Sequence, residues 1–304
     1  MRIEVHNVDH GSCVTVTGPT GDVLMLDCGR SLARPWSPAA YGARVIQTLI
    51  LQNLDEDHVE GLPGLCQPGA PEVRGIYSNP SVTAAALAAI KAGDMGKGVR
   101  QAHEVLRVYG AGGIGAWQHD LGGVHWQAFH NQYPWHFTDS NNLSVAVFVR
   151  WGNFTILLGG DMERAGWEQL LKNPAFVSRL AEVKVYIASH HGRENGQCAA
   201  LFNYMRPDIV ICSDCEKRHG TQETRDWYAA RVNGVQDYSK KWTGSGPVMR
   251  KVMTTRSDGT LDIRVNAAGG YMVYYEKSKP TIEEIIASLI PPASPLNRLL
   301  SGLP

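Results

Sequence analysis

The sequence predicts an α+β domain in which two β-sheets pack together and helices cover their outer faces. Segments of strand character and segments of helix character alternate in two rounds that meet near residue 120. The 304 residues are 43% hydrophobic and 19% charged, which is typical of a globular chain and not of a disordered one. We expect residues 1–278 to form one domain, followed by a short helix and a Pro-rich tail at 279–304.

In the first half, strands are predicted where apolar residues alternate or run together, at 2–8, 13–17, 23–27, 45–52 and 73–78. The glycines at 18 and 21 predict a hairpin turn between the second and third of these strands. Helices are predicted at 81–91, which is rich in alanine and has Ser81 as its N-cap, and at 97–109.

In the second half, the same patterns predict further strands at 124–129, 143–151, 154–158, 183–188, 208–212 and 271–275. Residues 253–265 are predicted to form a hairpin that turns at 257–259. Helices are predicted at 162–172, 222–232 and 282–290.

The overall charge excludes attraction of the whole molecule to nucleic acid, because 29 Lys and Arg residues balance 29 Asp and Glu residues. A local basic groove remains compatible with this balance. The sequence has neither an apolar run long enough for a membrane span nor a signal-peptide run, so we expect a cytoplasmic protein with reduced thiols. Cys212 and Cys215 have C-x-x-C spacing, but no second pair follows at zinc-ribbon spacing.

The most informative segment is the loop from Asn53 to His58, which follows an apolar strand. It places Asp55, Glu56 and Asp57 next to an imidazole. Carboxylates held this close raise each other's pKa, and a bound cation removes that repulsion. An acidic, solvated loop with a cap at Asp57 fits the segment equally well when it is taken alone.

Other polar groups also follow predicted strands. Asp161 comes directly after the strand at 154–158, where a helix N-cap is the simpler interpretation for a lone Asp. His190 and His191 follow the strand at 183–188 and fit a metal ligand beside an acid–base partner. Weaker clusters of the same kind lie at Asp27, at 136–142 and at His219. Such strand ends converge on one rim of a two-sheet structure, so we expect these side chains to form one site.

The motifs are, in order, N-V-D-H-G-S at 7–12, L-D-C-G at 26–29, N-L-D-E-D-H at 53–58, N-N-L-S at 141–144, L-G-G-D at 158–161, H-H-G at 190–192 and a turn at 255–259. In this order they resemble the motifs of metallo-β-lactamase-fold hydrolases. Within that superfamily they are most similar to the ComEC-type branch, named for the nuclease domain of bacterial DNA-uptake proteins. The first motif departs from the branch at Asp9, where a Gly is usual.

The resemblance implies a four-layer αββα sandwich with a two-metal site on one rim. One metal site would use Asp57, His58, Asp161 and one of His190 and His191. A weaker second site would use Asn53, Asp55 and a group from the 136–142 loop, where Asp139 and Asn142 are the candidates, and Asp27 would hydrogen-bond to ligands.

Position 53 departs from the branch, which has His there. An amide is a weaker metal ligand than an imidazole, and it leaves the second site with oxygen donors only. Such a site suits Mn²⁺ or Mg²⁺ better than Zn²⁺, or is partly filled or lost. We therefore expect one or two divalent ions, with Mn²⁺ or Zn²⁺ favoured and Mg²⁺ also compatible.

The resemblance implies a metal-dependent hydrolase, with phosphodiesters as the first substrate class and nuclease or nucleotide phosphodiesterase activity. The candidate catalytic residues are Asp57, His191 and His219, and the candidate substrate contacts are Arg193, Lys217 and Arg218, extended by Arg225, Lys240 and Lys241 and by Trp227 and Trp242 for base stacking. An ordinary charged surface explains these basic residues equally simply.

Two alternatives remain open at the level of sequence. One is a hydrolase of a small non-nucleic-acid ester or amide at the same site. The other is a non-catalytic binding or regulatory subunit of a multiprotein bacterial system, antiphage defence included, for which Asn53 is the support. A partner protein would then dock on the C-terminal tail at 279–304.

Overall fold

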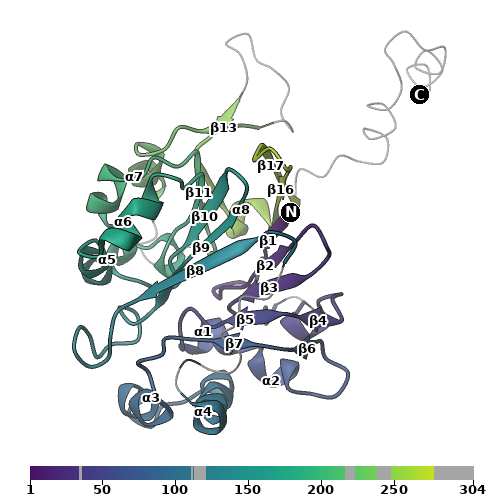
Figure 1. Cartoon of the computed structure of the whole chain (residues 1–304), viewed down its shortest axis with the longest axis vertical. Helices are drawn as coiled ribbons and strands as arrows, with labels where there is room; N and C mark the ends of the chain where they lie inside the picture. The colour runs from purple at the N-terminus through teal and green to yellow at the C-terminus, as the bar shows by residue number, and fades with distance from the viewer. Residues whose placement is uncertain (34–35, 111, 113–120, 216–222, 238–247, 277–304) are drawn as a thin grey trace, which may run out of the picture.

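The chain folds into four layers, a helical layer on each side of two facing sheets, as a computed structural model of the protein shows (Figure 1). The structure describes residues 1–33, 36–110, 112, 121–215, 223–237 and 248–276. Within these residues one sheet has seven strands and the other six. This arrangement confirms the predicted αββα sandwich.

The seven-stranded sheet contains both termini of the described chain. In spatial order its strands are β17 (Tyr271–Tyr275), β16 (Leu261–Val265), β1 (Arg2–Val5), β2 (Val14–Thr17), β3 (Val23–Leu26), β5 (Thr48–Ile50) and β7 (Ile76–Tyr77). The first five strands pair antiparallel, whereas β3, β5 and β7 run parallel. The predicted hairpin between β2 and β3 is confirmed, with the Gly18 N–H donating to the Asp22 carbonyl over 2.8 Å.

The six-stranded sheet has, in spatial order, β15 (Val252–Thr254), β12 (Ile209–Cys212), β11 (Val185–Ile187), β10 (Phe154–Leu158), β9 (Val145–Trp151) and β8 (His125–His130). The strands β10, β11, β12 and β15 run parallel, and β8, β9 and β10 run antiparallel. The chain therefore leaves the parallel strands at one edge of each sheet, which places the loops after β3, β5, β10, β11 and β12 close together.

The helices cover the outer faces of the sheets. On the seven-stranded sheet lie α1 (Glu56–Val59), α2 (Leu62–Leu65), α3 (Ala84–Lys91) and α4 (Lys97–Tyr109), and on the six-stranded sheet lie α5 (Arg164–Leu170), α6 (Pro174–Leu180) and α7 (Arg225–Ala229). The remaining elements are α8 (Thr255–Asp258), η1 (Pro38–Ala40), η2 (His190–Gly192), η3 (Glu194–Gly196), η4 (Ala199–Asn203), β4 (Val45–Ile46), β6 (Glu72–Val73), β13 (Val235–Gln236) and β14 (Met249–Arg250).

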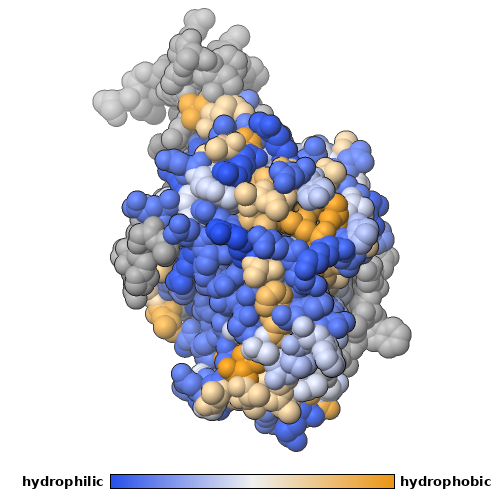
Figure 2. All heavy atoms as spheres, turned by 90° about the vertical axis from the view of Figure 1, so that its left-hand side faces the viewer, coloured by the Kyte–Doolittle hydropathy of each residue, from blue (hydrophilic) through white to orange (hydrophobic). Residues whose placement is uncertain are grey.

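Three hydrophobic clusters hold these layers together. The one between the sheets is rich in β-branched residues such as Ile3, Val147 and Ile156, all fully buried. Each such side chain stabilises the fold by about 1.5–3 kcal/mol on burial. The other two clusters lie under the helices of each outer layer. On the side seen in Figure 2 the surface is mostly hydrophilic, and polar residues separate its hydrophobic areas.

The predicted hairpin at 253–265 is wrong. β15 pairs with β12 in the six-stranded sheet, whereas β16 pairs with β1 in the other sheet. Between them the chain makes the short helix α8, whose start is capped by the Thr254 hydroxyl accepting from the Ser257 N–H. Turn residues signal a reversal of the chain but not which distant strand each arm joins, so the pattern suggested local pairing.

The helix predicted at 81–91 begins later, and its N-cap is Thr83 rather than Ser81. The Thr83 hydroxyl accepts from the Ala86 N–H. The Ser81 hydroxyl instead donates to the Asn79 side chain and accepts from the Tyr133 N–H, so it is already committed to other groups.

Other predicted boundaries also shift. The strand predicted at 45–52 is divided into β4 and β5, which pair with different neighbours. The helix predicted at 222–232 is reduced to α7. Within the described part of the chain, no helix combines the length and apolar character needed to cross a membrane. Several predicted features lie outside the described residues: His219, Lys217, Arg218, Lys240, Lys241, Trp242, the helix at 282–290 and the tail at 279–304.

Candidate metal centre

The loop after β5 is fixed in place by its own backbone. The Cys28 N–H donates to the His58 carbonyl over 2.8 Å, and the Ser12 N–H donates to the Asp57 carbonyl over 3.2 Å. Gly29 allows this close approach, because a Cβ there would lie 2.4 Å from the Asp57 carbonyl oxygen. Two motifs earlier in the chain, at 7–12 and 26–29, thus hold Asp57 and His58 in position.

Asp27 orients the His58 imidazole. This carboxylate is fully buried, with one oxygen accepting from the Gln52 N–H and the other from Nδ1 of His58, both over 2.7 Å. Its backbone is in the left-handed region (φ 56°), which Asp tolerates better than most residues. Because Nδ1 is engaged, Nε2 of His58 is the nitrogen that faces the site, 2.9 Å from Oδ1 of Asp161.

His191 is oriented in the same manner. Its Nδ1–H donates to the Ser213 carbonyl over 2.8 Å. Its Nε2 lies 3.1 Å from Oδ2 of Asp57 and 3.6 Å from Oδ1 of Asp161. His190 and His191 both have positive φ angles (51° and 56°), so the chain turns sharply after β11 and points the second imidazole inward.

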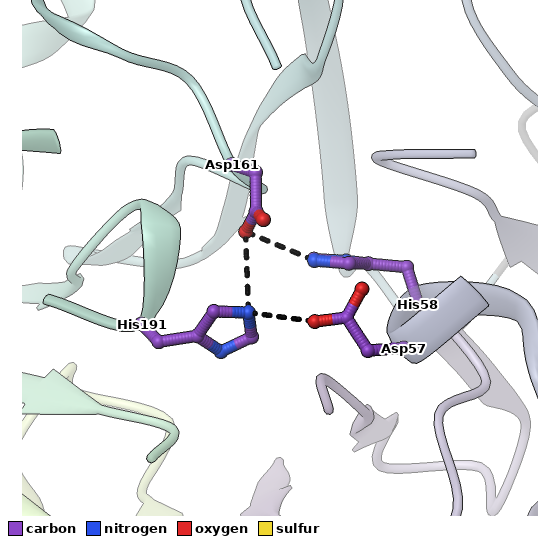
Figure 3. A group of neighbouring side chains, drawn as sticks. All are labelled: Asp57, His58, Asp161 and His191. Atoms are coloured by element: carbon purple, nitrogen blue, oxygen red, sulfur yellow. Dashed lines mark hydrogen bonds and ion pairs between the residues drawn. The ribbon is translucent and has the colours of Figure 1, made fainter. Parts of the chain in front are cut away.

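Four side chains therefore converge, as Figure 3 shows: Asp57, His58, Asp161 and His191. Each offers one ligand atom, and these atoms lie within 4.8 Å of one another. Although Nε2 of His58 and Oδ1 of Asp161 are close and buried, neither makes a hydrogen bond to the described residues. Two imidazole nitrogens and two carboxylates form a donor set that suits Zn²⁺ and other first-row divalent ions, so the residues fit a divalent metal.

The electrostatics show how strongly these groups depend on one another. Burial opposes ionisation of Asp57, but the neighbouring His58 and His191 lower its pKa to about 2. The same imidazoles hold the pKa of the Asp161 carboxyl below its usual range against the effect of burial. Burial likewise works against a charged His58, yet the nearby carboxylates raise its pKa. Without a metal, protons on the imidazoles supply the positive charge that the carboxylates require.

The structure distinguishes the two adjacent histidines. His191 belongs to the group of four, whereas Nε2 of His190 lies 3.9 Å from Oδ2 of Asp161. The other ring nitrogen of His190 lies 3.5 Å from the Glu163 carboxylate. His190 thus borders the cluster.

His10 is a site residue that the sequence did not single out. Its ring lies 4.5 Å from that of His191, and its Nε2 lies 3.8 Å from Oδ2 of Asp57. The Arg193 guanidinium can only donate, so Nε2 of His10 accepts its 2.8 Å hydrogen bond. The proton of His10 then lies on Nδ1, which faces the Cys215 sulfur at 3.7 Å.

Asp214, next to Cys215, completes a second group with ligand atoms within 4.8 Å, formed by His10, Asp214 and Cys215. Arginines accompany this group: Arg256 donates to the Asp214 carboxylate over 2.7 Å, and Arg193 donates to His10. These cations disfavour a metal ion at this second group.

Asp9 has a left-handed backbone conformation, which glycine adopts most easily. This accounts for the Gly that the resembled branch usually has at this position. Its φ angle is 58°, in the left-handed region. Its carboxylate accepts from the Ser31 hydroxyl and from the Leu32 and Ala33 N–H groups over 2.7–3.2 Å. These bonds stabilise the turn that carries His10.

The residues predicted for a second metal site are bound to other protein groups. The Asn142 side chain accepts from the Gly166 N–H over 2.8 Å and donates to Asp139, so it fastens the 136–142 loop to the start of α5. Asn53 and Asp55 are bonded to neighbouring polar side chains.

Of the predicted substrate contacts within the described residues, Arg193 lies at the site. Arg225 is exposed at the start of α7. One face of the Trp227 ring is covered by the Arg231 guanidinium at 3.8 Å, which leaves that face unavailable for base stacking.

No protein-family model matches the chain, and no curated protein matches it in sequence. Among solved structures it is similar to YhfI, a metallo-β-lactamase-fold protein from Bacillus subtilis (TM-score 0.48, 13% identity, 86% of this chain and 99% of that one). It is also similar to CmlA, a diiron β-hydroxylase from Streptomyces venezuelae (0.49, 12%, 87% and 54%), and to a diphosphatase of the PhnP family (0.44, 8%, 88% and 98%). Because these TM-scores are below 0.5 and the identities are 13% or less, the fold is assigned from the strand order of the chain itself. The similarity says nothing about the activity of the chain.

Proposed function

We propose that the chain is a metal-dependent phosphodiesterase whose substrate is a nucleic acid or a nucleotide. The observation that carries this proposal is the convergence of two oriented imidazoles and two carboxylates at the rim. A divalent ion held there would supply an activated water and polarise a phosphoryl oxygen. The ComEC-type order of the motifs supports nucleic acid as the substrate.

The chain's own residues perform the positioning. Asp57, His58, Asp161 and His191 would hold the ion. Asp27 and the Ser213 carbonyl keep the proton of each imidazole on Nδ1, so that both Nε2 atoms present lone pairs to the metal.

Arg193 supports an anionic substrate. One end of its guanidinium is bonded to His10, which stands 3.8 Å from Asp57. An arginine donates best to phosphate or carboxylate oxygens, so a guanidinium beside the metal cluster favours a phosphate ester over a neutral ester or amide.

One specific observation favours the alternative of a non-catalytic binding or regulatory member. Asn53 stands where the resembled branch has His, and its amide is bonded within the protein. A member that binds a partner without hydrolysis would tolerate this change.

The test is a hydrolysis screen of Mn²⁺- and Zn²⁺-loaded protein on a chromogenic phosphodiester, single-stranded DNA and cyclic nucleotides. We expect metal-dependent cleavage that Asp161→Ala abolishes together with metal binding. Arg193→Met should retain the metal while kcat/KM falls about 100-fold, because a charged hydrogen bond to the substrate is lost. Turnover that survives in Asp161→Ala would refute the shared site. A metal-loaded protein that is inert on every phosphodiester would favour the alternatives.

A further inference from the structure

Asn53 and Asp55 lie beside the metal cluster, and their side chains already bond to other groups of the protein. The Asn53 side-chain oxygen accepts from the Asp55 N–H over 2.7 Å, and its NH₂ donates to the Ser144 hydroxyl over 3.1 Å. The same hydroxyl accepts from the Asp161 N–H over 3.1 Å. Asn53 is 2% exposed, so its amide braces the loop that carries Asp161.

The Asp55 carboxylate already has a positive partner. One oxygen is paired with the ammonium of Lys91, and the other accepts from the Ser140 hydroxyl over 3.1 Å. Lys91 is the last residue of α3, and only 15% of its side chain is exposed. A basic residue at this position also faces the negative end of the helix dipole, which stabilises the helix.

The cavity beside Asn53 is too small for a hydrated ion. Its volume is about 20 Å³, which is enough for one water molecule. Its lining is mainly apolar and includes Leu87 and Ile90 from α3, next to Lys91. Leu, Ile and Val side chains cannot ligate a metal, and the polar residues of the lining are Gln52, Asn53, Asn79 and Ser140.

We propose that this chain holds a single metal ion and that the Lys91 ammonium takes the place of a second ion by neutralising Asp55. This inference rests on the proposed metal centre and specifies its form. A second divalent ion would have to displace the ammonium from Asp55 and release the Asn53 amide from Ser144. Neither exchange is compensated by an additional nitrogen ligand.

The test is metal stoichiometry, measured without reference to activity. Wild-type protein, Asn53→His, Lys91→Met and the double variant are loaded with excess Mn²⁺ or Zn²⁺, desalted and analysed by elemental mass spectrometry. We expect about one equivalent in the wild type and about two in the double variant, which regains a free carboxylate and an imidazole. Lys172→Met, which removes an exposed lysine on the other side of the sandwich, should stay at about one.

Electron paramagnetic resonance of the Mn²⁺-loaded proteins gives an independent result. An isolated ion is expected in the wild type, and an exchange-coupled pair, as for ions about 4 Å apart, in the double variant. Two coupled ions in the wild type would overturn the inference and leave the hydrolase proposal intact. No bound metal in the wild type would overturn the proposed function itself. A folded double variant, checked by circular dichroism, that still binds one ion would also overturn the role of Lys91.

Discussion

Asp27→Asn tests whether a buried carboxylate behind the metal site sets the affinity for metal. Asn has nearly the same shape but carries one acceptor and one donor where Asp has two acceptors. If the Asn oxygen keeps the bond from the Gln52 N–H, the NH₂ group faces Nδ1 of His58. The imidazole then holds its proton on Nε2, the atom that would bind the metal.

The cost follows from this geometry. Returning the proton to Nδ1 would set two buried donors against each other, which costs about 1–3 kcal/mol. At about 1.4 kcal/mol per factor of ten, this penalty corresponds to a loss of about 5- to 150-fold in metal affinity. Loss of a carboxylate behind a ligating His typically costs 10- to 100-fold, which agrees with this range.

The assay is competition for Zn²⁺ with a chromogenic chelator near neutral pH, for wild type, Asp27→Asn and Asp94→Asn. Asp94 is exposed and serves as the matched control. Asp27→Asn should fold without metal, because burial raises the pKa of Asp27 and its neutral form is readily accommodated. An affinity for Zn²⁺ within about twofold of wild type would refute the reasoning.

Three further substitutions test the framework. Gly29→Ala should lower both metal affinity and Tm, because its methyl group collides with the Asp57 carbonyl; an unchanged Tm would contradict that contact. Burial lowers the pKa of His6 from 6.5 to about 3. As the pH falls, the unfolded chain therefore binds a proton at His6 that the native chain does not bind. Lowering the pH from about 7 to about 5 should then cost about 2 kcal/mol of stability through His6 alone, which urea unfolding measures as the extra loss of wild type over His6→Gln in this range. Thr83→Ala should cost about 1 kcal/mol in the same assay through loss of a cap, and an unchanged midpoint would contradict the capping role.

The layers and most of the candidate ligands were predictable because local sequence patterns indicate them. Asp57, His58 and Asp161 lie in the loops that follow apolar strands, and parallel strands end at the same edge of each sheet. A strand end therefore fixes where such a side chain lies in space. By contrast, the choice between His190 and His191 depends on two left-handed backbone angles and on the Ser213 carbonyl just after β12, which no local pattern contains.

Long-range partners account for the rest. Lys91 reaches Asp55 from a helix 36 residues further along the chain, and His10 meets Arg193 across 183 residues. Neither residue has a distinctive local pattern. The error at 253–265 has the same origin, because each arm of the expected hairpin pairs with a strand far away in sequence.

The most direct test of the metal centre is an anomalous difference map from crystals grown with Zn²⁺ or Mn²⁺ and measured at the absorption edge of that metal. The account predicts one strong peak within coordination distance, about 2.0–2.3 Å, of Nε2 of His58, Nε2 of His191 and carboxylate oxygens of Asp57 and Asp161. A map from metal-soaked crystals with no peak among these four residues, or with its peak at His10 and Cys215 instead, would contradict it.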